Sequence, residues 1–492
     1  MKKSVKLISL LLVFILAFST LFLTSCKKTA DNGAADTSNP YIIKTEIKDG
    51  CIWVTYSDNP DTPVNVGAFG VEGNTRSDGS LNYLPLPNGT YGVTAGNARY
   101  LEEIVIPESY NGKPISTILE NAFNGATNLK KITIPSTITS VGENAFDNCG
   151  KLTYNEYDGA RYLGNDSNPY LVLVDAKETS IVKCTVNNST VAICDDAFYN
   201  CANLQVLTIP NSVTSIGARA FYNCSRLGAI NFPEGSTFIG SETFYGCTSL
   251  ESINIPASVS NIGTSAFANC KSLTTVTFAK NSTLTSIGNA VFSNCIKLKT
   301  ITLPKNVVNI GDHKANKNTD GVFYDCESLE SVVFEEGSSL NQIGNYAFDA
   351  CESLTTIKLP NTLTKLGISA FRSSGIKTIA LPNSLTSIGQ ETFYACTSLE
   401  EVTLGNATNS IGIKAFASCS KLNSVELPES VKYVGSSAFY QCSSLSSLTV
   451  KNPANWYAVG KKLVELDKAD MGNPATAAKL ATTDYYDHSF EK

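Results

Sequence analysis

Residues 216–238, IGARAFYNCSRLGAINFPEGSTF, hold one complete copy of the unit that decides the fold. The unit reads I-G-x-x-A-F-x-x-C-x-x-L-x-x-I-x-I-P-x-x-V-x-x. Seven of the twelve intervals between its phenylalanines are 23 residues, and the others are 22, 25, 25, 31 and 52. A fixed period of this length indicates a repeat protein, because one unit cannot bury its apolar face alone. The thirteen copies are centred on Phe123, Phe146, Phe198, Phe221, Phe244, Phe267, Phe292, Phe323, Phe348, Phe371, Phe393, Phe416 and Phe439.

Each part of the unit predicts a local structure. The alternation in I-x-I points two apolar side chains into the coil and one residue outward, as in a β-strand. Proline after the strand cannot donate to a ladder and ends the pairing. The short polar segment before phenylalanine predicts a tight helical turn or loop. We therefore expect a right-handed repeat solenoid over 101–450, mostly β with short helical turns, built from about thirteen 23-residue coils.

The unit resembles the BspA-like class of bacterial leucine-rich repeats, both in I-G-x-x-A-F-x-x-C-x-x-L and in the L-P that follows many strands. The segment ARYLGNDSNPYLVLV (160–174) is similar to an insertion common in that class. The resemblance covers about 101–450. It implies a cell-surface protein that adheres to a host or bacterial surface protein or to a glycan. Fold follows from the repeat, whereas function does not.

The first segment of the chain predicts export. A basic MKKSVK precedes an apolar run, and residues 1–25 are typical of a signal peptide. Leu23-Thr24-Ser25-Cys26 resembles the bacterial lipobox, which implies a diacylglyceryl group on Cys26 and two acyl chains for stable anchoring. The polar residues 26–40 would form a tether. The expected location is the extracellular face of the bacterial envelope, and the alternative is an uncleaved membrane helix.

Four segments depart from the period. Residues 41–100 predict an N-terminal β cap with a hairpin around Asp49-Gly50, and residues 451–492 predict a C-terminal cap with a helix at PATAAKLA and a final strand. A hairpin-type insertion is expected at about 153–190 and a loop insertion at 311–321. Insertions in solenoids often serve binding, and the alternative is a tolerated surface loop.

Eleven of the fifteen cysteines occupy one slot of the repeat, three residues after phenylalanine. Equivalent side chains in stacked coils point the same way, which is poor geometry for a disulfide, and Ala126 and Ser374 show that the slot needs no partner. We therefore expect a ladder of buried thiols. A bridge between Cys184 and Cys194 remains an alternative.

Composition and motif content limit the kinds of functional site that we expect in this chain. The net charge of −6, near −9 without residues 1–25, and the lack of a basic run argue against a nucleic-acid partner. His313 and His488 are the only histidines, and no zinc spacing, P-loop, dinucleotide fingerprint or G-x-S-x-G motif is present. We expect no enzyme, cofactor or metal site. The alternatives are a polymer-processing enzyme with a carboxylate pair and a passive envelope protein.

Two surfaces are candidates for binding. One is the outward residue of I-x-I, a flat row of small hydrogen-bonding side chains, although threonine is also simply favoured in strands. The other is a row of tyrosines directly after phenylalanine, which offers rigid contact area but could equally lie flat on the wall. The first comprises Thr208, Asn231, Asn254, Thr277 and Thr302, here called the threonine row. The second comprises Tyr199, Tyr222 and Tyr245, here called the tyrosine row.

Overall fold

The computed structural model describes residues 42–48, 51–56, 59–68, 81–312, 320–459, 463–466, 468–484 and 487–491. The chain divides into two compact units, Met1–Arg76 and Ser77–Lys492. The expected signal peptide, the tether with Cys26, and His313 lie outside the described residues. Within the described part, no helix combines the length and the apolar character needed to cross a membrane.

The first unit contains a three-stranded antiparallel sheet in the order β1–β2–β3. Lys48 pairs with Cys51, so a two-residue connection joins β1 to β2 where the sequence predicts a hairpin. The predicted cap over 41–100 is divided between the two units, because β4 (Asn82–Pro85) and β5 (Tyr91–Thr94) belong to the second. The strands are β1 (Ile42–Lys48), β2 (Cys51–Tyr56) and β3 (Asn59–Ala68).

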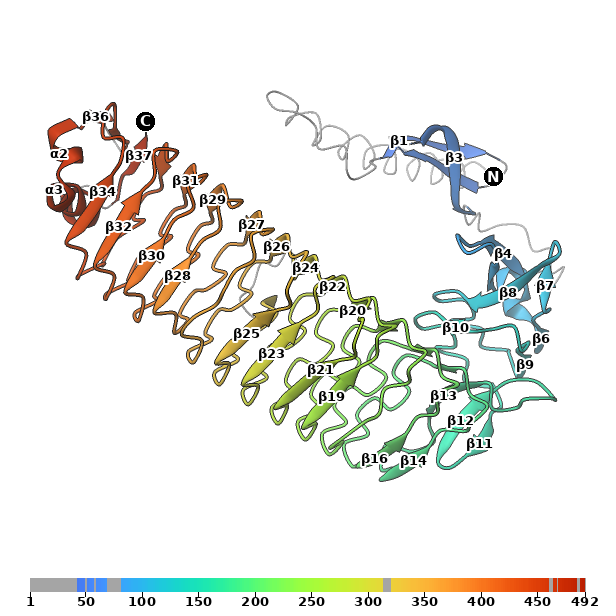
Figure 1. Cartoon of the computed structure of the whole chain (residues 1–492). Coiled ribbons are helices and arrows are strands. Elements are labelled where there is room, and N and C mark those ends of the chain that lie inside the picture. Colours follow the sequence, from blue (N-terminus) through green and yellow to red (C-terminus); the bar gives the residue numbers. More distant parts are fainter. Residues whose placement is uncertain are drawn as a thin grey trace, which may run out of the picture. The chain divides into compact units, whose positions relative to one another are not determined.

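The second unit is a β-solenoid whose coils contribute to two rows of parallel strands. Figure 1 shows one series of strands along one side of the stack: β16, β19, β21, β23, β25, β28, β30, β32 and β34. We call this row, built from L-x-x-I-x-I, the first ladder. It contains β6 (Glu103–Val105), β9 (Lys131–Thr133), β14 (Lys183–Thr185), β16 (Val206–Thr208), β19 (Ser252–Ile255), β21 (Thr275–Phe278), β23 (Thr300–Leu303), β25 (Ser331–Phe334), β28 (Thr378–Ala380), β30 (Glu401–Thr403), β32 (Ser424–Leu427) and β34 (Ser447–Val450).

The second ladder is built from the short strand that precedes the conserved glycine position of the unit. Its strands pair in parallel, as Ser286–Ile287 does with Asn309–Ile310. It contains β15 (Ala192–Ile193), β17 (Ser215–Ile216), β18 (Phe238–Ile239), β20 (Asn261–Ile262), β22 (Ser286–Ile287), β24 (Asn309–Ile310), β26 (Gln342–Ile343), β27 (Lys365–Leu366), β29 (Ser387–Ile388), β31 (Ser410–Ile411) and β33 (Tyr433–Val434).

The solenoid has about 15 turns, two more than the phenylalanine count. Ala95 and Ala176 stand where the other coils have phenylalanine: the Ala95 amide donates to the Ala122 carbonyl (2.8 Å), as the Phe123 amide does to Ala145 (2.8 Å). The first of these coils lies among β4 (Asn82–Pro85), β5 (Tyr91–Thr94), η1 (Gly96–Tyr100), β7 (Ser109–Tyr110), β8 (Lys113–Ile118) and β10 (Ser140–Val141).

Stacked phenylalanines form the axis of the core. From Phe198 to Phe439 each ring lies 5.1–5.8 Å from the next, measured between ring centroids, with nearly parallel planes. Leucine, isoleucine and valine of the two ladders are buried around this column. Stacking therefore buries a continuous apolar core, as the repeat predicts.

The cysteine slot has a specific partner. The thiol of Cys247 donates to the carbonyl oxygen of Phe221 in the preceding coil (Sγ–O 3.2 Å), and Cys270 does the same to Phe244 (3.2 Å). Ten of the eleven slot cysteines make this bond, which gives the buried carbonyl a second donor. The thiols of Cys184 and Cys194 are both free, so the structure does not contain the bridge left open above.

The segment before phenylalanine is a turn and not a helix. Its residue two before phenylalanine and the residue two after it adopt left-handed backbone angles, as Arg219 (φ 53°) and Asn223 (φ 56°) do around Phe221. Outside glycine this conformation costs about 1–2 kcal/mol per residue. Hydrogen bonds between coils offset the cost: the Asn223 amide donates to the Tyr245 carbonyl (2.7 Å).

The insertion near 153–190 lies inside the stack. Its strands form an antiparallel meander that joins the second ladder at β15. Tyr162 and Leu173 face the core of the coils that follow, whereas Leu163 and Val172 face the core of the coils that precede. The expected hairpin is present, with residues 160–163 paired antiparallel to residues 172–176; its two faces pack on the two cores, whereas residues 155–157 are exposed. The strands are β11 (Asn155–Tyr157), β12 (Ala160–Leu163) and β13 (Val172–Ala176).

The C-terminal residues close the last coil. Strand β37 pairs antiparallel with β33, so it ends the second ladder, and Trp456 is buried against the core. Asn473 accepts hydrogen bonds from the amides of Ala475 and Thr476 and caps α3. The expected helix and final strand are both present. The elements are β35 (Tyr457–Val459), β36 (Leu463–Glu465), α2 (Lys468–Gly472), α3 (Pro474–Lys479), η3 (Leu480–Asp484) and β37 (Ser489–Glu491).

Candidate binding surfaces

All five members of the threonine row are exposed. Four lie at the outward position of first-ladder strands; three have buried neighbours on either side, as in the pattern of β19, and Thr277 lies between buried Val276 and partly buried Phe278. Asn231 lies outside a strand, where only a bridge between Ala229 and Ser252 joins the neighbouring coils. The period of two along each strand thus places these side chains on one face of the solenoid.

Pairing between coils brings some members of the row into contact. Asn254 lies opposite Thr277, and the Thr277 hydroxyl donates to the amide oxygen of Asn254 (Oγ1–Oδ1 2.9 Å). Thr208 lies opposite Thr185, and Thr302 lies opposite Val333. The face therefore offers hydroxyl and amide groups one strand spacing apart, about 4.8 Å.

The tyrosine row is a stack of rings. Tyr199 and Tyr222 have centroids 4.9 Å apart, and Tyr222 and Tyr245 have centroids 4.7 Å apart with planes 5° from parallel. Burial, followed by the proximity of Tyr245, raises the pKa of Tyr222, so its phenol stays neutral at physiological pH. The ring faces cover one another, which leaves mainly the edges and hydroxyls of the inner ring for a partner.

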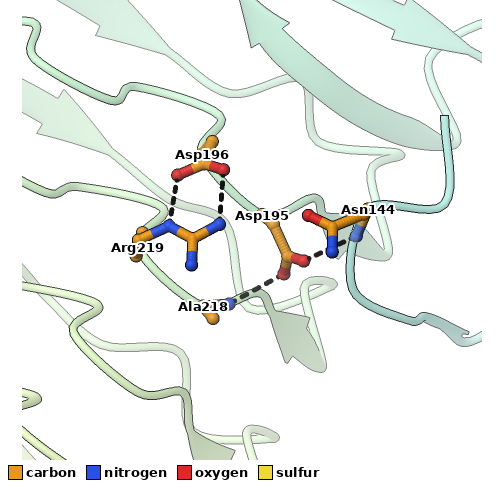
Figure 2. A network of polar contacts seen from close by, with 5 residues as sticks. All are labelled: Asn144, Asp195, Asp196, Ala218 and Arg219. Carbon is orange, nitrogen blue, oxygen red and sulfur yellow. Dashed lines mark hydrogen bonds and ion pairs between the residues drawn. The ribbon is translucent and has the colours of Figure 1, made fainter. Parts of the chain in front are cut away.

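A polar network joins the coils on the two sides of the meander. Figure 2 shows the Asp195 carboxylate between the main-chain amides of Asn144 (2.9 Å) and Ala218 (2.8 Å). Beside it, Arg219 makes two hydrogen bonds of 2.8 Å to Asp196. Burial raises the pKa of Asp195 to about 6, although both amide bonds act to lower it.

This network borders a cavity of about 440 Å³ that also touches Asp147, Asp175 and Cys194. Burial raises the pKa of both carboxyls and, most of all, of the Cys194 thiol, which is therefore protonated and a poor nucleophile. No group of three or more histidine, cysteine or acidic side chains within the described residues is placed to hold a metal ion. Sequence reasoning missed this cluster, because Asp195 and Asp196 occupy ordinary variable positions of the repeat.

Three comparisons relate the chain to known proteins. The model of the BspA type leucine rich repeat region matches six copies, at residues 96–165, 191–320 and 316–446. A comparison with curated proteins found no significant match. These matches cover more than half of the chain.

Three of the similar solved structures are of bacterial proteins. A leucine-rich repeat protein of Bacteroides ovatus is 27% identical, with 75% of this chain and 86% of that chain covered and a TM-score of 0.42. A leucine rich cell surface protein of Faecalibacterium prausnitzii is 21% identical, with 76% and 94% covered and a TM-score of 0.34. The pneumococcal vaccine antigen PcpA is 22% identical, with 84% and 83% covered and a TM-score of 0.34. On the extent of the repeat matches, the chain belongs to the BspA type leucine rich repeat family.

Proposed function

We propose that this protein is anchored on the outer face of the bacterial envelope and binds a protein or glycan partner through the threonine row. The observation that supports this proposal most is that the hydroxyl groups of the threonine row are exposed, and most of them make no hydrogen bond between coils. Within the described residues, the Thr208 and Thr302 hydroxyls make no hydrogen bond to the protein. They are therefore available to a partner.

Hydroxyls elsewhere on the wall serve the solenoid itself. Ser260 donates to the carbonyl oxygen of Thr237 (3.1 Å), Thr285 to that of Ser260 (3.1 Å), and Thr274 to that of Glu251 (3.1 Å). In each pair the donor satisfies a main-chain carbonyl of the coil before it. The contrast supports a function for the threonine row beyond the preference of threonine for strands.

The tyrosine row is the weaker candidate. Recognition by aromatic side chains uses the ring face as much as the edge. Because the three rings stack on one another, two of their six faces at most point away from the stack. Their mutual packing supports a structural role for this row.

The surface location rests on the sequence. Residues 1–25 are typical of a signal peptide, and the motif ending at Cys26 resembles a lipobox. Membership of the BspA type family supports the same location and a binding role. No observation favours the enzyme or the passive spacer strongly enough to propose either.

Paired charge insertion tests the binding surface. Thr208→Lys with Thr277→Lys, made in the full-length protein on its own cells, should reduce saturable adherence to immobilised host-matrix and bacterial-envelope extracts by about tenfold or more, because the new charges must be desolvated on binding. The matched control is Asn261→Lys with Ser387→Lys, which adds the same charge at exposed positions of the second ladder. Circular dichroism should show all variants equally folded.

The tyrosine pair separates the two surfaces. Tyr222→Ala with Tyr245→Ala should reduce adherence less than the threonine-row variant does. If the tyrosine variant abolishes adherence and the lysine variant leaves it intact, the tyrosine row is the binding surface. If the two lysine pairs have equal effects, net charge explains the result and the proposal fails.

A further inference from the structure

The coil of Phe348 carries no strand at its first-ladder position, residues 355–359, just as the coil of Phe221 carries none at residues 229–232. The coil that follows that of Phe348 carries β28 but is short: the interval from Phe371 to Phe393 is 22 residues, one fewer than the period, and the missing residue falls in Ser374-Gly375, directly before the apolar Ile376. Gly375 fits here because a Cβ atom would collide with the Glu352 carbonyl oxygen of the coil before it. The shortened segment therefore runs close to the main chain of its neighbour.

The first ladder consists of several separate short sheets, and one of the gaps between them falls here. Strand β23 pairs with β25, and pairing resumes only from β28 to β34, so residues 355–359 between them form no strand. The phenylalanine column continues without a gap, with centroids 5.1 Å apart for Phe348–Phe371 and 5.5 Å for Phe371–Phe393. The coils thus remain stacked at the core, although both ladders are interrupted near the shortened coil, because β27 and β29 belong to different sheets.

Main-chain groups at the break lack partners. From Thr356 to Leu359, no amide or carbonyl group hydrogen-bonds to another described residue, apart from the Thr355 carbonyl just before, which accepts from the Lys377 amide (2.8 Å). The side chains of Ile357 and Leu359 are buried. Unpaired main-chain groups at partly buried positions cost free energy unless something outside the protein satisfies them.

A groove of about 570 Å³ opens at the break, on the same outward face as the threonine row. Ala380 is the smallest outward residue of the ladder there and leaves space between the larger side chains of Lys358 and Thr403. The groove is surrounded by hydroxyl and amide side chains and by one pair of opposite charges, Lys358 and Glu401. The remaining lining residues are Thr356, Ile357, Leu359, Asn361, Thr378, Ile379, Leu381, Pro382 and Asn383.

The residues that line the groove indicate which kind of ligand fits it. Pockets for small molecules are enclosed and largely apolar or aromatic, whereas this groove is open, polar and lined by no aromatic side chain. Its unpaired amides and carbonyls match the alternating donors and acceptors of an extended main chain. Lys358 and Glu401 give it no strong preference for either sign of charge.

We infer that this groove, centred on Ala380, is a docking subsite for an extended polypeptide segment of the protein's partner. The inference rests on the proposed function and deepens it, because it narrows the partner to a protein and marks one place on the binding face. The threonine row provides a polar lattice along the face, and the groove provides main-chain contacts that the regular ladder lacks.

Peptide selection tests the subsite directly. A phage-displayed library of short unstructured peptides is selected on the full-length protein, and the recovered peptides are measured on Ala380→Trp, whose indole fills the groove from an exposed position. Affinity should fall by about tenfold or more. Glu426→Trp, also outward and exposed on β32 but outside the groove lining, is the matched control and should bind normally.

Hydrogen exchange gives an independent readout. Amides of Thr356–Leu359 should exchange faster than those of Glu401–Thr403 in the free protein, and a selected peptide should slow them. Failure to recover peptides, or equal binding to Ala380→Trp and wild type, overturns the subsite. The proposed function is judged separately by adherence of the threonine-row lysine variant, which lies several coils away.

Discussion

Each core phenylalanine from Phe221 to Phe416 is held on both faces by its equivalents in the adjacent coils. Phe267 is fully buried between Phe244 (5.3 Å) and Phe292 (5.7 Å). Phe267→Ala should therefore lower the free energy of unfolding by about 3–5 kcal/mol, through lost burial and the cavity left behind. Urea denaturation followed by circular dichroism measures it. Phe238→Ala, at a side chain that is 46% exposed, is the control and should cost much less; equal losses would contradict the stacked column.

At the residue scale, the sequence predicts that the repeat cysteines are buried but does not predict what their thiols contact. A buried thiol at three residues after phenylalanine follows from the repeat and from the small substitutes Ala126 and Ser374. Its partner does not follow, because Cys247 reaches Phe221, 26 residues back, and that offset depends on the register between coils. The thiol donates to a buried carbonyl, which explains why cysteine and not simply any small apolar residue fills most of these slots.

At the scale of the element, the sequence predicts strands well and irregularities poorly. Strands of the first ladder occur where I-x-I predicts them, but two coils were missed because Ala95 and Ala176 replace the phenylalanine used to align the repeat. The shortened interval at Ser374-Gly375 is visible in the sequence. The absence of a strand at 355–359 required the structure, because the sequence of that segment keeps the apolar alternation of its neighbours.

At the same scale, the Asp195 carboxyl in the polar network of Figure 2 predicts that the free energy of unfolding depends on pH. Its folded pKa of about 6 lies above the ordinary carboxyl value, so folding favours the protonated form. This contribution to stability is present below the ordinary pKa and is lost as pH rises through 6. The free energy of unfolding of wild type, relative to Asp195→Asn, should therefore increase as pH falls from 7 to 4.

Denaturation of both proteins across that pH range measures the effect. Taking the difference between them removes contributions from the other carboxyls whose pKa burial raises, such as Asp147 and Asp175. A difference that is independent of pH, or that decreases toward pH 4, would contradict the environment described for Asp195.

At the scale of the whole molecule, the sequence predicts which residues face outward. It does not predict which of their side chains already bond to, or pack against, the neighbouring coil. Thr285 and Thr302 are both exposed threonines of the repeat, yet only the first donates to a carbonyl of the preceding coil. Likewise the tyrosine row is evident in the sequence, whereas the face-to-face packing of its rings is not. The choice between candidate surfaces therefore depends on contacts between coils, which a single repeat does not contain.

Anchoring determines whether this face can reach a partner outside the cell. If Cys26 carries two acyl chains, Cys26→Ala should abolish incorporation of a radioactive fatty acid and leave the chain either released or as the uncut precursor, because the lipid is attached to that thiol. Cys51→Ala is the matched control, since Cys51 lies in strand β2 beyond the expected tether, and it should be labelled normally. Labelling with mass determination checks both variants. A Cys26→Ala protein that loses residues 1–25 yet stays equally membrane-bound would show that something other than the lipid holds it.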